Sequence, residues 1–397
     1  MPGSGRVVDR VLPRDGVPAR TDRDRRTPPG GVDVRGSARR PRRADRPDRR
    51  HVREHRTRPV RRPGGGAAFR GRGRRSPRPR PRRATQPDPL GGTAVTGSGD
   101  VVVAVDVGGT HVKCALVDTR GDRRHRERHP TGAERGPEAV VATILDIVRT
   151  LADRARAQGL VPQAVGVAVP GVVDEVEGVA QHAANLPLRD VPLRKLVAEH
   201  VELPTVLGHD VRAGGLAEAR LGAGQHTTHM LFVPIGTGIA AAYLTGGAVL
   251  TGAGAAGELG HVVIRPDGPR CACGGRGCLE AVASAAAIAR RAGMPAPEVV
   301  ARAVAGDPAA ADIWRDAVRA LADGLLTAQA LLDPEVIVLG GGLSQAGDAL
   351  LGPVRAEVLD RLTSYREPQI LRASFGDEAG CLGAGLLALD HWQGRTK

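Results

Sequence analysis

The chain has 397 residues, which is enough for two or three domains. Its net charge of +14 is uneven: residues 1–99 contain 28 arginines, no lysine and 9 acidic residues, whereas the other 29 basic and 34 acidic residues leave the remainder mildly acidic. The five cysteines form no regularly spaced even set, which excludes a disulfide framework. No apolar segment follows the N-terminal arginines, so we expect no secretory signal. We therefore expect a cytoplasmic protein.

Residues 1–99 are dominated by Arg-Pro and Arg-Gly repeats, with Phe69 as the single aromatic residue. Such a composition buries too little apolar surface to offset the entropy of folding, so we predict a disordered extension. A basic arm that contacts nucleic acid is one interpretation, but stacking aromatics and a helix-turn-helix pattern are absent, so we expect no specific nucleic-acid partner. The all-arginine bias is also typical of translated GC-rich DNA, which favours a true start near Val95 or Val101.

Folded sequence begins at Asp100 with an apolar run, a Gly-Gly-Thr turn and a second apolar run, the pattern of a β-hairpin. Asp106 ends the first strand, and the turn consists of Gly108, Gly109 and Thr110. A glycine-tipped hairpin can bring backbone N–H groups close to phosphate, although one such turn is weak evidence by itself. His111 and Lys113 follow, and either can supply the basic side chain.

Downstream, the apolar spacing of Glu138 to Gln158 predicts a helix that packs on the sheet. The run AVGVAVPG predicts a buried strand that ends near Gly171, and a turn-rich segment follows to Asn185. His209 and Asp210 then end a short strand and open a helix of small residues, where an aspartate is most often an N-cap.

The uncharged stretch from Met230 to Gly257 is long enough to span a membrane, but its glycines, proline and threonines favour hairpin strands of a soluble core. We therefore expect no membrane partner. A second glycine-tipped turn lies within this stretch, at Gly236, Thr237 and Gly238, and further on a predicted strand ends at Gly340, Gly341 and Gly342. After the second turn the sequence predicts an Ala-rich helix from Glu280 and another helix from Asp312 to Leu332.

The most specific stretch runs from Gly257 to Glu280, GELGHVVIRPDGPRCACGGRGCLE. Cys271, Cys273 and Cys278 follow His261 across an apolar Val-Val-Ile run that has the composition of a strand. Three thiolates and one imidazole form a closed tetrahedral set, which suits structural zinc. The alternative is a disulfide, but a C-x-C bridge is strained and leaves one cysteine over.

The combined pattern G-E-x-G-H and C-x-C-G-x-x-G-C-x-E resembles the signature of the ROK family (repressor, open reading frame, kinase) of bacterial sugar kinases and sugar-responsive repressors. The resemblance covers residues 101–389 and places the chain in the actin-like ATPase and sugar-kinase superfamily. It implies that Asp210 is the general base. It implies sugar contacts from Gly171, Asn185, His209, Asp210, Glu258, His261 and Glu280; ATP and Mg²⁺ contacts from Asp106, Gly108, Gly109, Thr110, Lys113, Gly236, Thr237, Gly238, Gly340, Gly341 and Gly342; and structural Zn²⁺ on His261, Cys271, Cys273 and Cys278. His209 stands where the family has asparagine, which leaves the acceptor sugar open.

The resemblance implies an α/β fold with two ribonuclease-H-like lobes around a cleft. The expected divisions are an extension at 1–99, a first lobe at 100–212 completed by a closing helix at 377–397, and a second lobe at 213–376 that carries the zinc loop. The implied reaction is ATP-dependent phosphorylation of a hexose, in the first place glucose to glucose 6-phosphate. The alternatives are a kinase for another hexose or an N-acetylated amino sugar, and a sugar-responsive transcriptional regulator. The family also leads us to expect a dimer or tetramer.

Overall fold

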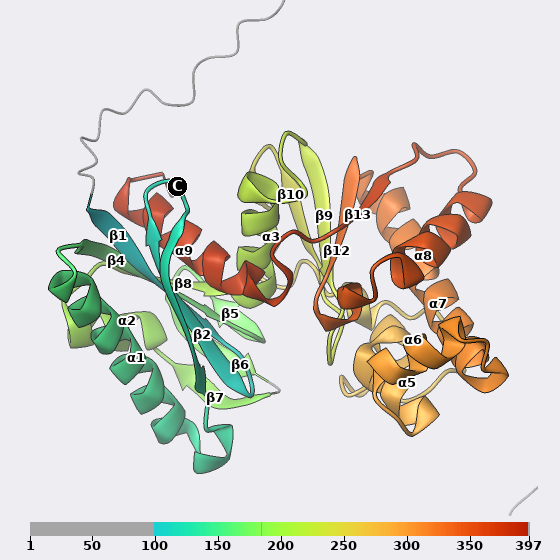
Figure 1. Ribbon diagram of the computed structural model, residues 1–397, viewed down its shortest axis with the longest axis horizontal. Coiled ribbons are helices and arrows are strands. Elements are labelled where there is room, and N and C mark those ends of the chain that lie inside the picture. The colour runs from blue at the N-terminus through green and yellow to red at the C-terminus, as the bar shows by residue number, and fades with distance from the viewer. Residues whose placement is uncertain (1–98, 184, 396–397) are drawn as a thin grey trace, which may run out of the picture. The chain divides into compact units, whose positions relative to one another are not determined.

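The computed structural model describes residues 99–183 and 185–395, and the predicted disorder of residues 1–99 therefore falls almost entirely outside the described residues. The described chain has an α/β fold built around two five-stranded mixed sheets (Figure 1). None of the described helices is long and apolar enough to cross a membrane.

The first sheet has the order β3-β2-β1-β4-β8. Strands β1 (Asp100–Val107), β2 (His111–Asp118) and β3 (Arg123–Pro130) are antiparallel, whereas β1, β4 (Val161–Val169) and β8 (Thr205–His209) are parallel. The predicted hairpin is confirmed, because Val107 pairs with Val112 across the Gly-Gly-Thr turn. The parallel strands end along one edge of this sheet.

The second sheet repeats this arrangement in the order β11-β10-β9-β12-β13. Strands β9 (His229–Pro234), β10 (Ala242–Thr245) and β11 (Ala248–Val249) are antiparallel, and β9, β12 (Val336–Gly340) and β13 (Gln369–Arg372) are parallel. The two sheets therefore share one strand order and one pattern of directions, and a glycine turn follows the central strand of each.

Helices cover the sheets. The first sheet packs one face on α1 (Pro137–Ala157) and α2 (Leu193–Val201). One face of the second sheet packs on a helical layer that also includes the short 3₁₀ segments η2 (Leu259–His261) and η3 (Gly342–Ala346). The helices of this layer are α4 (Leu279–Ala283), α5 (Ala285–Ala292), α6 (Ala296–Val304), α7 (Pro308–Leu332) and α8 (Asp348–Arg361). Among the described residues, the other 3₁₀ turns are η1 (Ala133–Arg135) and η4 (Gly376–Glu378).

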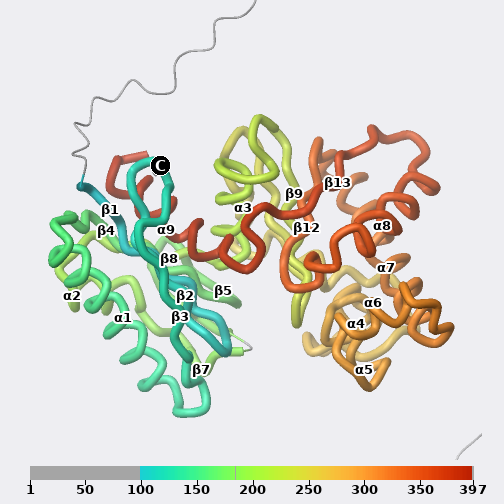
Figure 2. Tube along the Cα trace, in the orientation of Figure 1, coloured from blue at the N-terminus to red at the C-terminus, as the bar shows by residue number. Residues whose placement is uncertain are grey.

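Two helices, α3 (Asp210–Leu221) and α9 (Ala379–Trp392), join the other faces of both sheets in one buried cluster. The red trace in Figure 2 follows the chain from the second sheet to α9, which lies against β1, β4 and α3. Glycines permit this close packing: a Cβ on Gly383 of α9 would overlap the carbonyl oxygen of Ala213 in α3.

Three sequence predictions were wrong in detail. The segment predicted as turn-rich up to Asn185 instead contains β5 (Val172–Asp174) and β6 (Val179–Ala183), which form a three-stranded antiparallel sheet with β7 (Leu186–Val191). The apolar side chains of this sheet pack on the first core. The Val-Val-Ile run is no strand, because its backbone pairs with the cysteine-bearing loop through single contacts such as Leu279 N–H to Val262 O. The Ala-rich helix after Glu280 is broken at Ser284, whose hydroxyl caps α5.

The close packing of α9 on α3 predicts that Gly383→Ala lowers the free energy of unfolding by about 1–3 kcal/mol, because the added methyl must push two helix backbones apart. Gly352→Ala is the matched control: Gly352 is an exposed helical glycine with nothing within 4 Å of an added Cβ, so the change should be neutral or stabilising. Urea denaturation measures both. Equal effects of the two substitutions would contradict the packing described here.

Candidate active site

Asp106 lies at the end of the central strand β1 of the first sheet, with only 13% of its side chain exposed. Its Oδ2 lies 3.9 Å from Nζ of Lys113, its cross-strand partner. Burial and, to a smaller extent, the negative charge of Asp210 raise the pKa of the Asp106 carboxyl, Lys113 lowers it, and the resulting pKa is about 7. Asp106 and Asp210 are therefore close enough to repel each other.

The strand register explains why these carboxylates meet. Asp106 pairs with Ala168 on β4, and Ala168 pairs with Gly208 on β8, directly before His209 and Asp210. Asp106 and Asp210 thus lie at the same edge of the sheet, two strands apart, which corresponds to roughly 10 Å between backbones.

Asp210 is the first residue of α3, and the N-cap is His209. The backbone N–H of Val211 donates to Oδ1 of Asp210 at 2.7 Å and to Nδ1 of His209 at 3.2 Å. Within the described chain Oδ2 of Asp210 accepts no hydrogen bond, and the side chain is 31% exposed. The carboxylate is therefore fixed through one oxygen and has the other available to a ligand.

The first glycine turn contacts the segment that carries Asn185. A Cβ on Gly109 would lie 2.9 Å from the backbone oxygen of Asn185, so a larger residue would displace this segment. Thr110 is exposed and lies 3.2 Å from Nδ1 of His111, whereas Lys113 contacts Asp106 and the backbone oxygen of Asp377. Lys113 therefore places its positive charge beside the buried Asp106 carboxylate, and His111 lies beside the turn. Gly108 donates to His111 O at 2.9 Å, which closes the turn.

Gly171 follows β4 with a φ of 91°, a conformation that favours glycine. A Cβ at this position would overlap the carbonyl oxygen of His182 on β6. The Pro-Gly turn therefore fits closely against the three-stranded sheet.

The second glycine turn is tied to two of the other predicted groups. The backbone N–H of Ile239, directly after Gly238, donates to Oε2 of Glu280 at 2.9 Å. On the other side of the turn, Ile235 donates to Gly340 O at 3.0 Å and accepts from Leu343 N–H at 3.0 Å. The structure thus brings together three of the predicted groups. They are the second glycine turn (Gly236, Thr237 and Gly238), the Glu280 carboxylate, and the glycines at the end of β12 (Gly340, Gly341 and Gly342).

The predicted His–Cys cluster, His261 with Cys271, Cys273 and Cys278, assembles as expected: its four potential ligand atoms all lie within 4.8 Å of one another. Cys271 Sγ is 3.7 Å from His261 Nδ1, and Cys273 Sγ is 3.7 Å from Cys278 Sγ. These separations match the edge of about 3.8 Å expected for a tetrahedron with Zn–S bonds of about 2.3 Å. All five cysteines are free, so the disulfide alternative finds no support.

The two glutamates lie beside this cluster. Glu258 Oε2 is 3.7 Å from Nε2 of His261, the nitrogen that faces away from Cys271. Glu280 Oε1 is 4.0 Å from Cys271 Sγ. Each carboxylate therefore contacts one member of the cluster: Glu258 contacts His261, and Glu280 contacts Cys271. Such supporting contacts are common around metal ligands.

In the described chain no hydrogen bond or ion pair joins Asp210 directly to Glu258 or Glu280. Glu175 and Arg212, which the sequence patterns did not single out, link the turn of Asp210 to Gly254, four residues before Glu258. The one sequence signal was the charged Arg212 within the small-residue start of α3. Together with neighbouring residues, Glu175 and Arg212 line a pocket of about 360 Å³.

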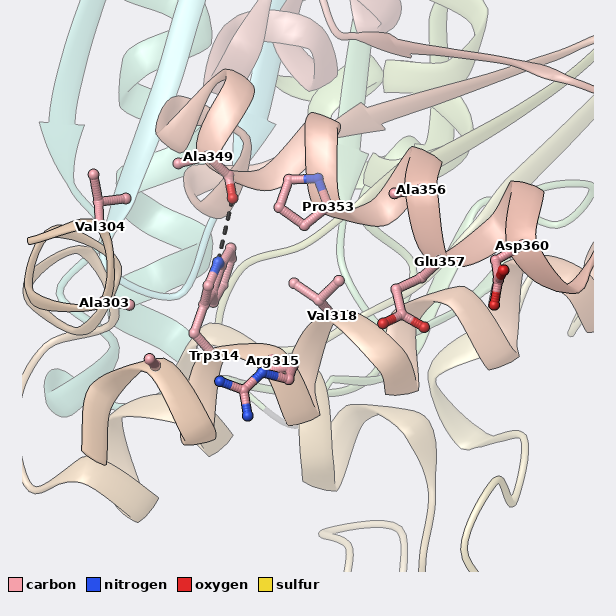
Figure 3. Close-up of a pocket in the computed structure, with 11 residues that line it drawn as sticks. Ala303, Val304, Trp314, Arg315, Val318, Ala349, Pro353, Ala356, Glu357 and Asp360 are labelled. Carbon is pink, nitrogen blue, oxygen red and sulfur yellow. Dashed lines mark hydrogen bonds between the residues drawn. The ribbon is translucent and has the colours of Figure 1, made fainter. Parts of the chain in front are cut away.

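Two other features lie apart from the predicted residues. A pocket of about 690 Å³ between α6, α7 and α8 is lined mainly by apolar side chains, among them Trp314 and Val318, and contains none of the predicted site residues (Figure 3). A second His-Cys-Glu group surrounds Glu127 on β3, but Arg154 at 3.0 Å and hydrogen bonds from two histidines already satisfy that carboxylate.

Comparisons with known proteins identify the family of the chain. The sequence model of the ROK family matches residues 102–391. The glucokinase of Thermotoga maritima is 34% identical over 307 residues, which covers 71% of this chain and 95% of the relative. An N-acetylmannosamine kinase of Escherichia coli is 33% identical over 293 residues and covers 72% of this chain and 97% of the relative.

Among solved structures, a ROK family glucokinase from Streptomyces griseus in complex with glucose and AMPPNP is 30% identical, with a TM-score of 0.63. The alignment covers 72% of this chain and 99% of that structure. The match of the family model across most of the described residues, together with relatives above 30% identity, shows that this chain belongs to the ROK family.

Proposed function

We propose that the protein is an ATP-dependent sugar kinase that phosphorylates a hexose, in the first place glucose to glucose 6-phosphate. The observation that carries this proposal is the position of Asp210 at the sheet edge beside Asp106, with one carboxylate oxygen available to a ligand. The relatives named glucokinase and N-acetylmannosamine kinase, and the related structure solved with glucose and AMPPNP, support the reaction class.

In this proposal Asp210 is the general base. Its free Oδ2 accepts the proton of the attacking hydroxyl while Val211 N–H holds the other oxygen. Phosphoryl transfer requires positioning and neutralisation of charge more than covalent help from the protein, and base catalysis adds on the order of 10²–10⁴-fold.

The glycine turns would hold the nucleotide. The backbone at 108–110 and 236–238 lacks bulky side chains and can approach phosphates, and Lys113 adds a positive charge. Gly340, Gly341 and Gly342 would lie against the adenosine. Asp106 fits the hydrated Mg²⁺ of the nucleotide, because a divalent cation would offset its repulsion with Asp210. When bound, the Mg²⁺ neutralises charge on the phosphate oxygens.

The acceptor sugar would bind to Glu258, His261 and Glu280, with Gly171, Asn185 and His209 along the opposite border. The His–Cys cluster fits structural Zn²⁺ in donor type and spacing, and such an ion would fix the loop from which the glutamates project without entering the chemistry.

We further propose the division expected from the family: two ribonuclease-H-like lobes, at 100–212 with 377–397 and at 213–376. The shared strand order of the two sheets and the contact of α9 with the first sheet support this division. A cytoplasmic dimer or tetramer remains part of the proposal.

The alternatives differ in the acceptor or in the class of protein. A kinase for another hexose or for an N-acetylated amino sugar is favoured by the N-acetylmannosamine kinase among the relatives and by His209 in place of the family asparagine. A transcriptional regulator is less well supported, because it does not require Asp210 or the glycine turns.

A coupled assay of ADP release tests the proposal directly. Purified protein with ATP and Mg²⁺ should turn over at least one member of a panel of glucose, mannose, fructose, N-acetylglucosamine and N-acetylmannosamine, with glucose expected to have the highest kcat/KM. Absence of sugar-dependent ADP release for every member, in protein that binds glucose, would favour the regulator.

Asp210→Asn should reduce kcat by on the order of 10²–10⁴-fold, because the amide cannot take the hydroxyl proton. The Kd for the sugar, measured by isothermal titration calorimetry, should stay within a few-fold of its original value. The control is Asp312→Asn, an exposed carboxylate on α7 that should leave both quantities unchanged. Retained turnover by Asp210→Asn would remove this residue from the role of base.

Cys273→Ser should lower both the zinc content, measured by elemental mass spectrometry, and the Tm. Cys273 is the exposed cysteine of the cluster, so loss of packing alone should have little effect on stability. Cys381→Ala, which changes a buried cysteine outside the cluster, should leave the zinc content unchanged even if the Tm falls. Unchanged zinc in Cys273→Ser would count against the metal assignment.

A further inference from the structure

Arg212 is a buried arginine on the first turn of α3, two residues after Asp210. Only 8% of its side chain is exposed. Burial of a guanidinium is costly unless the group is paired and hydrogen-bonded, so its partners show which segments it joins.

The first partner is Glu175, in the turn between β5 and β6. Its Oε1 accepts the backbone N–H of His209 at 2.9 Å and lies 3.3 Å from Nη1 of Arg212. One carboxylate therefore contacts the residue before Asp210 and a residue just after it. A carboxylate is favoured at this place, because the N-terminus of a helix presents free N–H groups and a positive dipole end.

The second partner lies in the loop that leads to Glu258. Nη2 of Arg212 donates to the carbonyl oxygen of Gly254. Gly252, Gly254 and Gly257 in this loop all have positive φ, between 56° and 107°, so its backbone adopts conformations that few other residues favour. Arg212 thus joins the turn of Asp210 to a glycine-rich segment that ends one residue before Glu258.

These contacts do not use every hydrogen-bond donor of the Arg212 guanidinium. Its Nε is buried and has no hydrogen-bond partner among residues 99–183 and 185–395. Arg212 also lines the pocket of about 360 Å³ together with Glu175 and residues 251–255. The side chain therefore lies where the segments that would border the acceptor come together.

We propose that Glu175 and Arg212 are positioning residues, together called the clamp. They fix the position of the turn that carries Asp210 (residues 209–212, the base turn) relative to the loop before Glu258 (residues 250–257, the acceptor-binding loop). This inference rests on the proposed sugar-kinase function. Neither side chain contacts the reacting atoms; Glu175 holds the backbone at His209, and Arg212 restrains the loop before Glu258. Without this pair the acceptor hydroxyl would be aligned with Asp210 in fewer molecules, and such misalignment is costly because catalysis depends on orientation.

Steady-state kinetics of Arg212→Ala test the proposal. We expect kcat/KM for the acceptor sugar to fall on the order of 10²-fold, while the KM for ATP changes less than about threefold. Arg212→Lys should recover part of the loss, because an ammonium keeps the charge but lacks the planar fork that reaches two partners. Glu175→Gln should resemble Arg212→Lys, and the double variant Glu175→Gln/Arg212→Ala should be little worse than Arg212→Ala, since the residues act as one unit.

The matched control is Arg220→Ala, which removes an arginine on the same helix whose ion pair with Asp390 lies away from the base turn. It should lower the Tm without changing kcat/KM for the sugar more than about threefold. If Arg212→Ala and Arg220→Ala reduce the Tm and the sugar kinetics in the same proportion, Arg212 has only a structural role and the proposal is overturned.

Hydrogen–deuterium exchange separates this inference from the proposed function. Arg212→Ala should increase exchange in residues 250–257, and Arg220→Ala should not. Should the unaltered protein phosphorylate no hexose, the proposed function fails, but increased exchange still supports the clamp between the base turn and the loop. Unchanged exchange in Arg212→Ala overturns the clamp whatever the activity.

Discussion

The proposed mechanism depends on the proximity of two carboxylates at one edge of the first sheet. Asp106 lies at the end of β1 and Asp210 directly follows β8, and burial together with mutual repulsion raises the pKa of Asp106 to about 7. Such an arrangement costs stability unless a cation balances it. In the proposed mechanism a magnesium-bound nucleotide would supply that balance, and Asp210 would act as the base.

The rest of the fold supports the other proposed binding groups. Both sheets have the same strand order, and each presents a glycine turn after its central strand. The second turn is held by Glu280, which also contacts the His–Cys cluster, so the groups proposed for nucleotide, sugar and zinc share contacts on this side. Small residues let α9 and α3 approach closely behind the turns, which joins the two sheets through a common core.

Local patterns made much of this predictable from the sequence. The hairpin at Gly108, the strand-to-helix transition at Asp210 and the His–Cys cluster depend on residues close together in the chain. The clamp could not be foreseen, because Glu175 and Arg212 are 37 positions apart and Gly254 lies a further 42 away. The Val-Val-Ile run misled because its composition fits a strand, whereas its backbone bonds to the cysteine-bearing loop.

The most direct measurement of the central claim is a crystal structure of the protein with glucose, Mg²⁺ and a non-hydrolysable ATP analogue. The proposed mechanism predicts the acceptor hydroxyl within about 2.6–3.2 Å of Asp210, facing the γ-phosphate, with the sugar held by Glu258, His261 and Glu280. A sugar bound elsewhere, or an Asp210 carboxylate turned away from the acceptor hydroxyl, would contradict it.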